Sequence, residues 1–142
     1  MIQLLVGTKG TGKAKALIKN IEQAVLSEKG DIVCITRGDK LNNSFDRSVR
    51  LVDVDSFDIS SYKVFYGFLC GVISQNFDIT HIFVDRVTRL VSDDLVALSH
   101  FINLVKELSE KFNVSFTITL SADPKDIPES IAEYSIDFVA SC

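Results

Sequence analysis

Hydrophobic residues follow two patterns that alternate along the chain: short, almost continuous apolar runs, and longer stretches with apolar residues at helical spacing. The short runs are typical of buried β-strands, and the longer stretches are typical of helices. Strands are predicted at residues 2–6, 31–36, 49–54, 80–85, 114–120 and 136–140. Helices are predicted at residues 13–29, 60–76, 92–111 and 124–133. This alternation indicates an α/β fold, for which we expect a three-layer α/β/α sandwich around a mostly parallel central sheet.

The second predicted helix, residues 60–76, is apolar almost all round, so we expect it to be well buried. Its Gly67 and Gly71 lie four residues apart and therefore share one face of the helix. Each glycine costs a helix about 1 kcal/mol relative to alanine. That cost predicts a packing reason, namely the close approach of another backbone at this face.

Length and composition suit one globular domain over residues 1–142. Hydrophobic residues make up 46% and charged residues 24%, which is ordinary for an α/β domain. The formal net charge of −4 argues against a nucleic-acid partner held by bulk electrostatics. A local basic patch remains at the start of the first helix, formed by Lys9, Lys13, Lys15 and Lys19.

The sequence also predicts a cytoplasmic protein without a membrane partner. Met1 leads straight into a strand, with no basic start or cleavage site typical of a secretory signal. The longest strongly apolar stretch, residues 64–73, is about half the length of a membrane span. Three widely spaced cysteines suggest neither a disulfide framework nor a zinc site. A protein partner or a homo-oligomer stays open.

Residues 7–13, Gly-Thr-Lys-Gly-Thr-Gly-Lys, carry the clearest candidate chemistry because they lie between the first predicted strand and the first predicted helix. The Walker A loop requires Gly, four free residues, Gly-Lys and then Ser or Thr, in this strand–loop–helix context. The first three fixed positions match, and Ala14 stands at the fourth. The nucleotide-binding residues predicted from this degenerate loop are Gly7, Thr8, Lys9, Gly10, Thr11, Gly12, Lys13, Ala14 and Lys15.

The physical basis of this prediction is the convergence of donors on phosphate oxygens. A tight glycine-rich loop aims successive backbone N–H groups inward, and the helix that follows adds the positive end of its dipole. Lys13 would reach the β- and γ-phosphates as a point charge. Ala14 lacks the hydroxyl that holds Mg²⁺ in the full motif, so we expect weakened Mg²⁺ binding. The simpler alternative is a glycine turn whose lysines face solvent, and a dinucleotide-binding loop fits less well because Lys15 replaces its third glycine.

Residues 82–85, Ile-Phe-Val-Asp, have the form of a Walker B strand, in which Asp85 is the predicted Mg²⁺ ligand. Arg86 follows, where many ATPases carry a glutamate that activates water. Arginine is not a general base, so contact with a phosphate and a surface ion pair are the two alternatives for Arg86. Acidic residues also follow other predicted strands. One hypothesis is that one of them acts as a substitute base, and the simpler hypothesis is that they are solvated loop residues. Those acids are Asp53, Asp55 and Asp123. His81 and His100 are predicted to be structural.

On residues 7–13, 66–71 and 78–85 the chain resembles the P-loop NTPase superfamily and, within it, a group of small bacterial ATP-binding proteins, some labelled twitching-motility ATPases. The order of elements is also similar to the RecA-like core of thymidine kinases, which insert a strand between the Walker A and Walker B strands. That kinase family carries Asp-Glu where this chain has Asp85 and Arg86, and it ends in a zinc lobe whose cysteine pairs this sequence lacks. The resemblance therefore implies the fold but not nucleoside phosphorylation.

Three functions follow as hypotheses. The first is binding of ATP, or of another nucleoside triphosphate, with weak or absent hydrolysis, as the substitutions at Ala14 and Arg86 suggest. The second is a Mg²⁺-dependent ATPase or phosphotransferase with an unconventional base. The third is a non-enzymatic interaction protein in which the loop is a relic. No catalytic residue is assigned.

Overall fold

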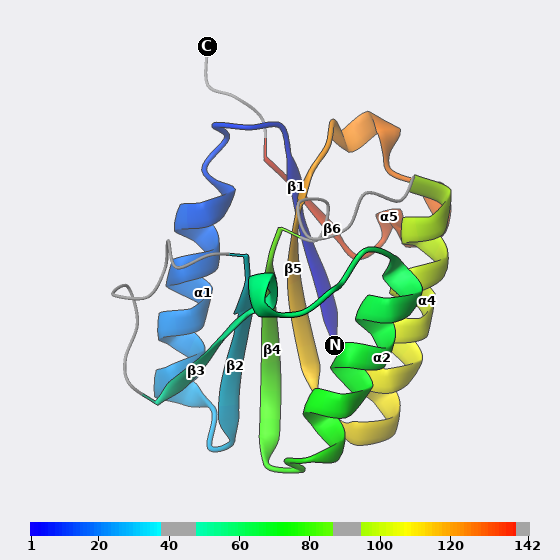
Figure 1. Cartoon of the computed structure of the whole chain (residues 1–142). Coiled ribbons are helices and arrows are strands. Elements are labelled where there is room, and N and C mark those ends of the chain that lie inside the picture. Colours follow the sequence, from blue (N-terminus) through cyan, green and yellow to red (C-terminus); the bar gives the residue numbers. More distant parts are fainter. Residues whose placement is uncertain (38–47, 87–94, 139–142) are drawn as a thin grey trace.

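A computed structural model shows a parallel β-sheet with helices on both of its faces (Figure 1). The structure describes residues 1–37, 48–86 and 95–138. Within them lies a six-stranded sheet in the order β3-β2-β4-β5-β1-β6, and every pair of neighbouring strands is parallel. The strands are β1 (Ile2–Gly7), β2 (Asp31–Thr36), β3 (Val49–Asp53), β4 (Ile79–Asp85), β5 (Ser115–Ser121) and β6 (Ser135–Phe138).

The helices connect these strands. They are α1 (Lys13–Ser27), α2 (Tyr62–Ser74), α4 (Leu95–Phe112) and the short α5 (Glu129–Ala132), with 3-10 turns at Val54–Ser56 and Pro124–Asp126. Among the described residues, no helix has the combination of length and apolarity that crossing a bilayer demands. The order of strands and helices and the parallel strand pairing confirm the α/β class and the parallel sheet that the hydrophobic pattern predicted.

Alternate residues of each central strand point to opposite faces of the sheet, which gives two separate apolar layers. In β1, Leu5 packs with Leu17 and Ile21 of α1, whereas Leu4 and Val6 join the larger core under α2 and α4. Both faces of the strands are buried, which explains why they read as continuous apolar runs rather than alternating ones. Figure 1 shows α1 on one side of the sheet and α2 with α4 on the other.

Predicted and observed elements differ mainly at their ends. The first helix ends at Ser27 rather than at residue 29, because the backbone is already extended at Glu28. The second begins at Tyr62, where the Ser61 hydroxyl accepts a hydrogen bond from the backbone N–H of Val64 at 3.2 Å. The predicted first turn of the third helix, residues 92–94, lies outside the described residues, as do residues 139–140 of the last predicted strand.

The prediction that α2 is well buried holds for one face of the helix only. Its buried residues are Tyr62, Phe65, Leu69 and Ile73, which form a single stripe. Gly67 and Gly71 are exposed, and a Cβ added at either position would meet no heavy atom within 4 Å. These glycines therefore do not serve a close backbone approach within the described chain. The reason is architectural, because α2 packs on the sheet and on α4 while its outer side faces solvent.

The order of the strands determines which side chains can meet at the carboxyl ends of the strands. Strand β5 lies between β1 and β4, as in the core that the thymidine-kinase resemblance implied. The residues paired across these strand ends are Gly7 with Ser121, and Ile118 with Val84. Because all the strands run the same way, the loop after β1 and the carboxyl end of β4, which is residue Asp85, lie at the same end of the sheet (Figure 1).

Candidate functional site: a cationic pocket between the β1–α1 loop and β4

The loop from β1 to α1 depends on two glycines with left-handed backbone conformations. Gly10 has φ 83° and Gly12 has φ 94°, values that L-residues with a side chain rarely adopt. Gly12 is the N-cap of α1, and no side chain caps the helix there. The first N–H groups of α1 therefore keep their capacity to bind an anion, which is the property expected of a phosphate-binding loop.

Gly7 is required for a different reason, the lack of space around it. A Cβ at this position would lie 2.6 Å from the carbonyl oxygen of Phe138 and 2.6 Å from Thr11 Oγ1. Thr11 Oγ1 in turn donates a hydrogen bond to the carbonyl oxygen of Thr8 at 2.8 Å. The loop is thus curled tightly between the ends of β1 and β6, and only glycine fits at its base.

The side chain of Lys13 lies inside this loop. Its Nζ donates to the carbonyl oxygen of Gly7 at 2.7 Å and to that of Thr8 at 2.8 Å, and the residue is only 6% exposed. Burial lowers the pKa of Lys13, and the nearby Arg86 lowers it further, while Asp85 acts in the opposite direction. In the simple-turn alternative this lysine faces solvent, and the structure places it inside. Lys9 and Lys15 are exposed.

The end of β4 supplies the second side of the site. Asp85 accepts a hydrogen bond from Thr119 Oγ1 at 2.9 Å, and Arg86 Nη1 donates one to Ser121 Oγ at 3.3 Å. Both hydroxyls come from β5, the strand between β1 and β4, so β5 orients the two charged residues beside the loop. Sequence reasoning did not single out Thr119 or Ser121. The available signal was the presence of polar residues at alternate positions of a strand otherwise composed of apolar ones.

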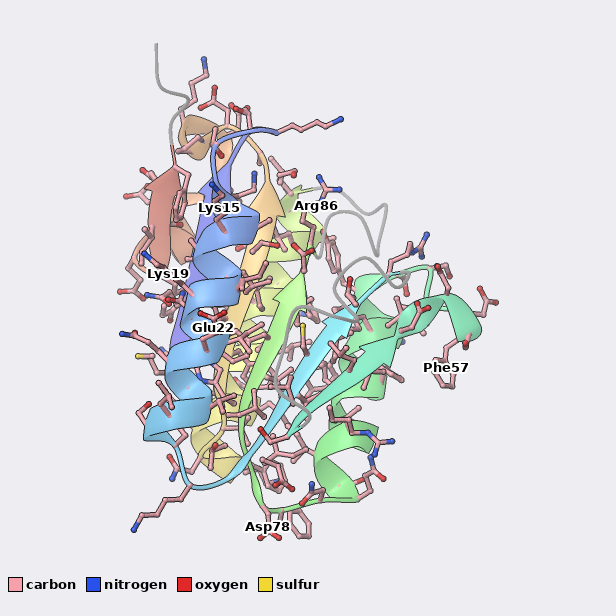
Figure 2. The ribbon with its side chains drawn as sticks, turned by 90° about the vertical axis from the view of Figure 1, so that its left-hand side faces the viewer. Lys15, Lys19, Glu22, Phe57, Asp78 and Arg86 are labelled. Atoms are coloured by element: carbon pink, nitrogen blue, oxygen red, sulfur yellow. The ribbon has the colours of Figure 1, made fainter. Side chains whose placement is uncertain are left out.

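These residues enclose a pocket of about 430 Å³, which we call the cationic pocket. Its lining consists of Lys9, Gly10, Gly12, Lys13, Ala14, Lys15, Asp85 and Arg86. The lining therefore contains four cationic residues and one carboxylate. Figure 2 shows Lys15 near the start of α1 and Arg86 at the end of β4, both toward the same end of the sheet. The structure brings the two predicted half-sites together, while Lys19 lies farther along α1, outside this lining.

The lining of the cationic pocket offers Mg²⁺ one carboxylate and no side-chain hydroxyl. This ion prefers oxygen ligands in an octahedral arrangement, mostly carboxylates, phosphates and water. Asp85 is the one carboxylate in the lining, it accompanies the Lys13 and Arg86 cations, and Ala14 offers a methyl group. In residues 1–37, 48–86 and 95–138 no cluster of three or more potential metal-ligating side chains occurs. The role of Asp85 as a Mg²⁺ ligand stays a prediction, whereas the pocket's charge suits a polyanion.

The acids considered as substitute bases are all used elsewhere. Asp53 accepts from the backbone N–H of Asp55 at 2.9 Å, and Asp55 pairs with Arg37 Nε at 3.3 Å. Asp123 accepts from the N–H of Lys125 at 3.1 Å. None of the three acids belongs to the lining of the cationic pocket. Their interactions are those of turn and surface residues, which agrees with the simpler of the two readings.

His81 has the structural role expected of it, at the opposite end of β4. Its Nδ1 lies 2.7 Å from Glu28 Oε2, and its Nε2 lies 2.8 Å from Thr117 Oγ1. A carboxylate only accepts hydrogen bonds, so Nδ1 is the donor, and in the neutral ring Nε2 accepts from the threonine hydroxyl. Burial lowers the pKa of His81, against the opposing effect of Glu28. Both His81 and Thr117 are buried, and neither lines the cationic pocket. His100, by contrast, is exposed.

We predict that stability falls on acidification because of His81. Its pKa in the folded protein lies below the ordinary value of about 6.5, so the unfolded chain binds more protons in the window beneath that value. The stabilisation is present above pH 6.5 and is lost as the pH falls through the lowered pKa. Urea unfolding at pH 8 and pH 5.5 measures this loss, which should be smaller in the His81→Gln variant. Equal losses in both proteins would contradict the assignment.

A second hollow, of about 490 Å³, lies between α2 and α4. It is lined mainly by apolar and aromatic side chains, among them Tyr66, Phe101 and Leu104, with Lys63 and His100 also in the lining. This hollow is slightly larger than the cationic pocket but has no loop of converging backbone donors. We therefore place the candidate chemistry at the cationic pocket.

Comparison with known proteins adds no assignment, since no family model matches the chain and no curated protein sequence matches it. The functional argument accordingly depends on the geometry and charge described above.

Proposed function

We propose that the protein binds a nucleoside triphosphate in the cationic pocket, with ATP preferred on the basis of the resemblance stated above. In this proposal the chain is a single P-loop NTPase domain with a three-layer α/β/α architecture, and hydrolysis is weak or absent. The observation that carries the proposal is the position of Lys13, buried inside a loop whose base admits only glycine and whose Gly10 and Gly12 have positive φ.

The charge of the pocket supports a polyanionic ligand such as a triphosphate. The nearby charge of Arg86 lowers the pKa of Lys13, and a polyphosphate between the two cations would relieve that repulsion. The uncapped N-terminus of α1 adds backbone donors and a favourable dipole. These features bind phosphate groups regardless of the base attached to them, so the preference for adenine comes from the resemblance alone.

Weak or absent hydrolysis follows from the chemistry of two positions. Arg86 stands where a water-activating acid would be required and does not act as a general base. Ala14 provides no oxygen for the metal ion that normally neutralises charge during phosphoryl transfer. Asp53, Asp55 and Asp123 are engaged outside the cationic pocket, so none of these three acids replaces that base.

Thermal unfolding with and without nucleotide tests this proposal. A ligand at 100 times its Kd stabilises the folded state by about 2.7 kcal/mol, which corresponds to several degrees for a chain of this size. We expect ATP or GTP to raise the Tm by this amount and adenosine, which lacks phosphates, to leave it unchanged. No change with millimolar ATP or GTP, with and without Mg²⁺, would overturn the proposal, and equal stabilisation by adenosine would exclude phosphate recognition.

A further inference from the structure

Arg86 is the residue of the cationic pocket that the ordinary chemistry of a Walker site does not explain. It follows Asp85 directly, lines the same pocket as Lys13, and is oriented by a 3.3 Å hydrogen bond from its Nη1 to Ser121 Oγ. This hydrogen bond uses one of several guanidinium donors, and a guanidinium presents its donors in a planar fork that matches phosphate oxygens. An arginine at this position is therefore equipped to bind a phosphate group.

The charges in the pocket also point to Arg86 as a phosphate ligand. Mg²⁺ normally neutralises part of the charge on a bound triphosphate and is held in part by the hydroxyl after the Walker lysine. Here Ala14 replaces that hydroxyl, while Arg86 adds a permanent positive charge at the neighbouring strand end. Compared with a complete Walker site, this pocket therefore lacks one metal ligand on its α1 side and has an additional cation on its β4 side.

We propose that this site binds its polyphosphate without a metal ion, and that the Arg86 guanidinium contacts the phosphates where Mg²⁺ would otherwise neutralise them. This inference rests on the proposed function, since it concerns the form in which the nucleotide is bound. Asp85 then orients and partly balances the cations, held by its hydrogen bond from Thr119, and does not need to ligate a metal ion. The ligand class is a nucleoside triphosphate as the free anion rather than as its magnesium complex.

Calorimetric titration of the full chain with ATP, in EDTA and in excess Mg²⁺, tests the inference. We expect the wild type to bind ATP in EDTA at least as tightly as in Mg²⁺. Arg86→Ala should weaken binding in EDTA about 10-fold or more, the range expected for a hydrogen bond to a charged group. Arg86→Lys, which keeps the charge but loses the fork, should recover part of the affinity. Arg50→Ala is the matched control, because Arg50 is exposed on β3 and outside the pocket lining.

Each outcome separates this inference from the proposed function. If the wild type binds ATP only with Mg²⁺, the inference fails and the proposed function stands. If it binds ATP under neither condition, the proposed function itself fails. If Arg86→Ala binds ATP in EDTA as tightly as the wild type and Arg50→Ala do, Arg86 is not a phosphate ligand. The comparison of EDTA with Mg²⁺ on the wild type decides the question even if an Arg86 variant does not fold, which thermal unfolding without ligand detects.

Discussion

Replacing Lys13 by alanine is expected to weaken ATP binding by about 100-fold or more, the largest loss from any single substitution in the cationic pocket. The Lys13 ammonium group lies inside the loop and would make charge-assisted contacts to two phosphates, each contributing about 1.5–3 kcal/mol. About 1.4 kcal/mol corresponds to a tenfold change in affinity. Titration calorimetry of the wild type and the Lys13→Ala variant under identical salt conditions measures the loss.

The matched control for Lys13 is Lys19→Ala, which removes the same charge from the exposed side of α1 (Figure 2). It should change the affinity less than about twofold, because exposed charges are screened by solvent and salt. Lys13→Gln, which keeps a neutral donor near the carbonyl oxygens of Gly7 and Thr8, tests whether the loop merely lost its internal hydrogen bonds. Wild-type affinity in Lys13→Ala, or an equal loss in Lys19→Ala, would contradict the role given to Lys13.

The sequence contained enough information for the strands and for the two halves of the site. Strands buried on both faces read as continuous apolar runs, so β1, β2 and β4 were recognisable without any partner in view. The loop at residues 7–13 was recognisable because left-handed turns and close approach require glycine at fixed spacing. Parallel strands then bring residues at their carboxyl ends to one edge, which is why Asp85 could be placed beside the loop.

Other features depend on three-dimensional neighbours that no local pattern specifies. The hydrogen bonds from Thr119 to Asp85 and from Arg86 to Ser121 exist because β5 lies between β1 and β4. Which face of α2 is buried likewise depends on what packs against it. A helix that is apolar nearly all round gives no clear periodic signal for its inner face, so the sequence did not indicate that only one face of α2 is buried.

Phe65→Ala should lower the free energy of unfolding by about 3–5 kcal/mol, the range for deleting a buried phenylalanine side chain. Phe65 is fully buried on the inner stripe of α2, and its ring stacks on Phe101 with centroids 5.6 Å apart. The cavity left behind would lie between α2, α4 and the sheet, where the surrounding core is tightly packed. Urea unfolding of the wild type and the variant at one pH above 7, where His81 titration does not contribute, measures the difference.

The control for this prediction is the Phe57→Ala variant. Phe57 is 54% exposed and contacts Phe68 with ring centroids 5.4 Å apart, so its removal should cost about 1 kcal/mol or less (Figure 2). The two side chains are equally hydrophobic, and the expected difference in stability comes from their difference in burial. Similar losses in both variants would contradict the prediction, because they would show that Phe57 contributes as much to stability as the fully buried Phe65. A large loss confined to Phe65→Ala would instead support the inner stripe of α2 as the side that holds the helix to the sheet.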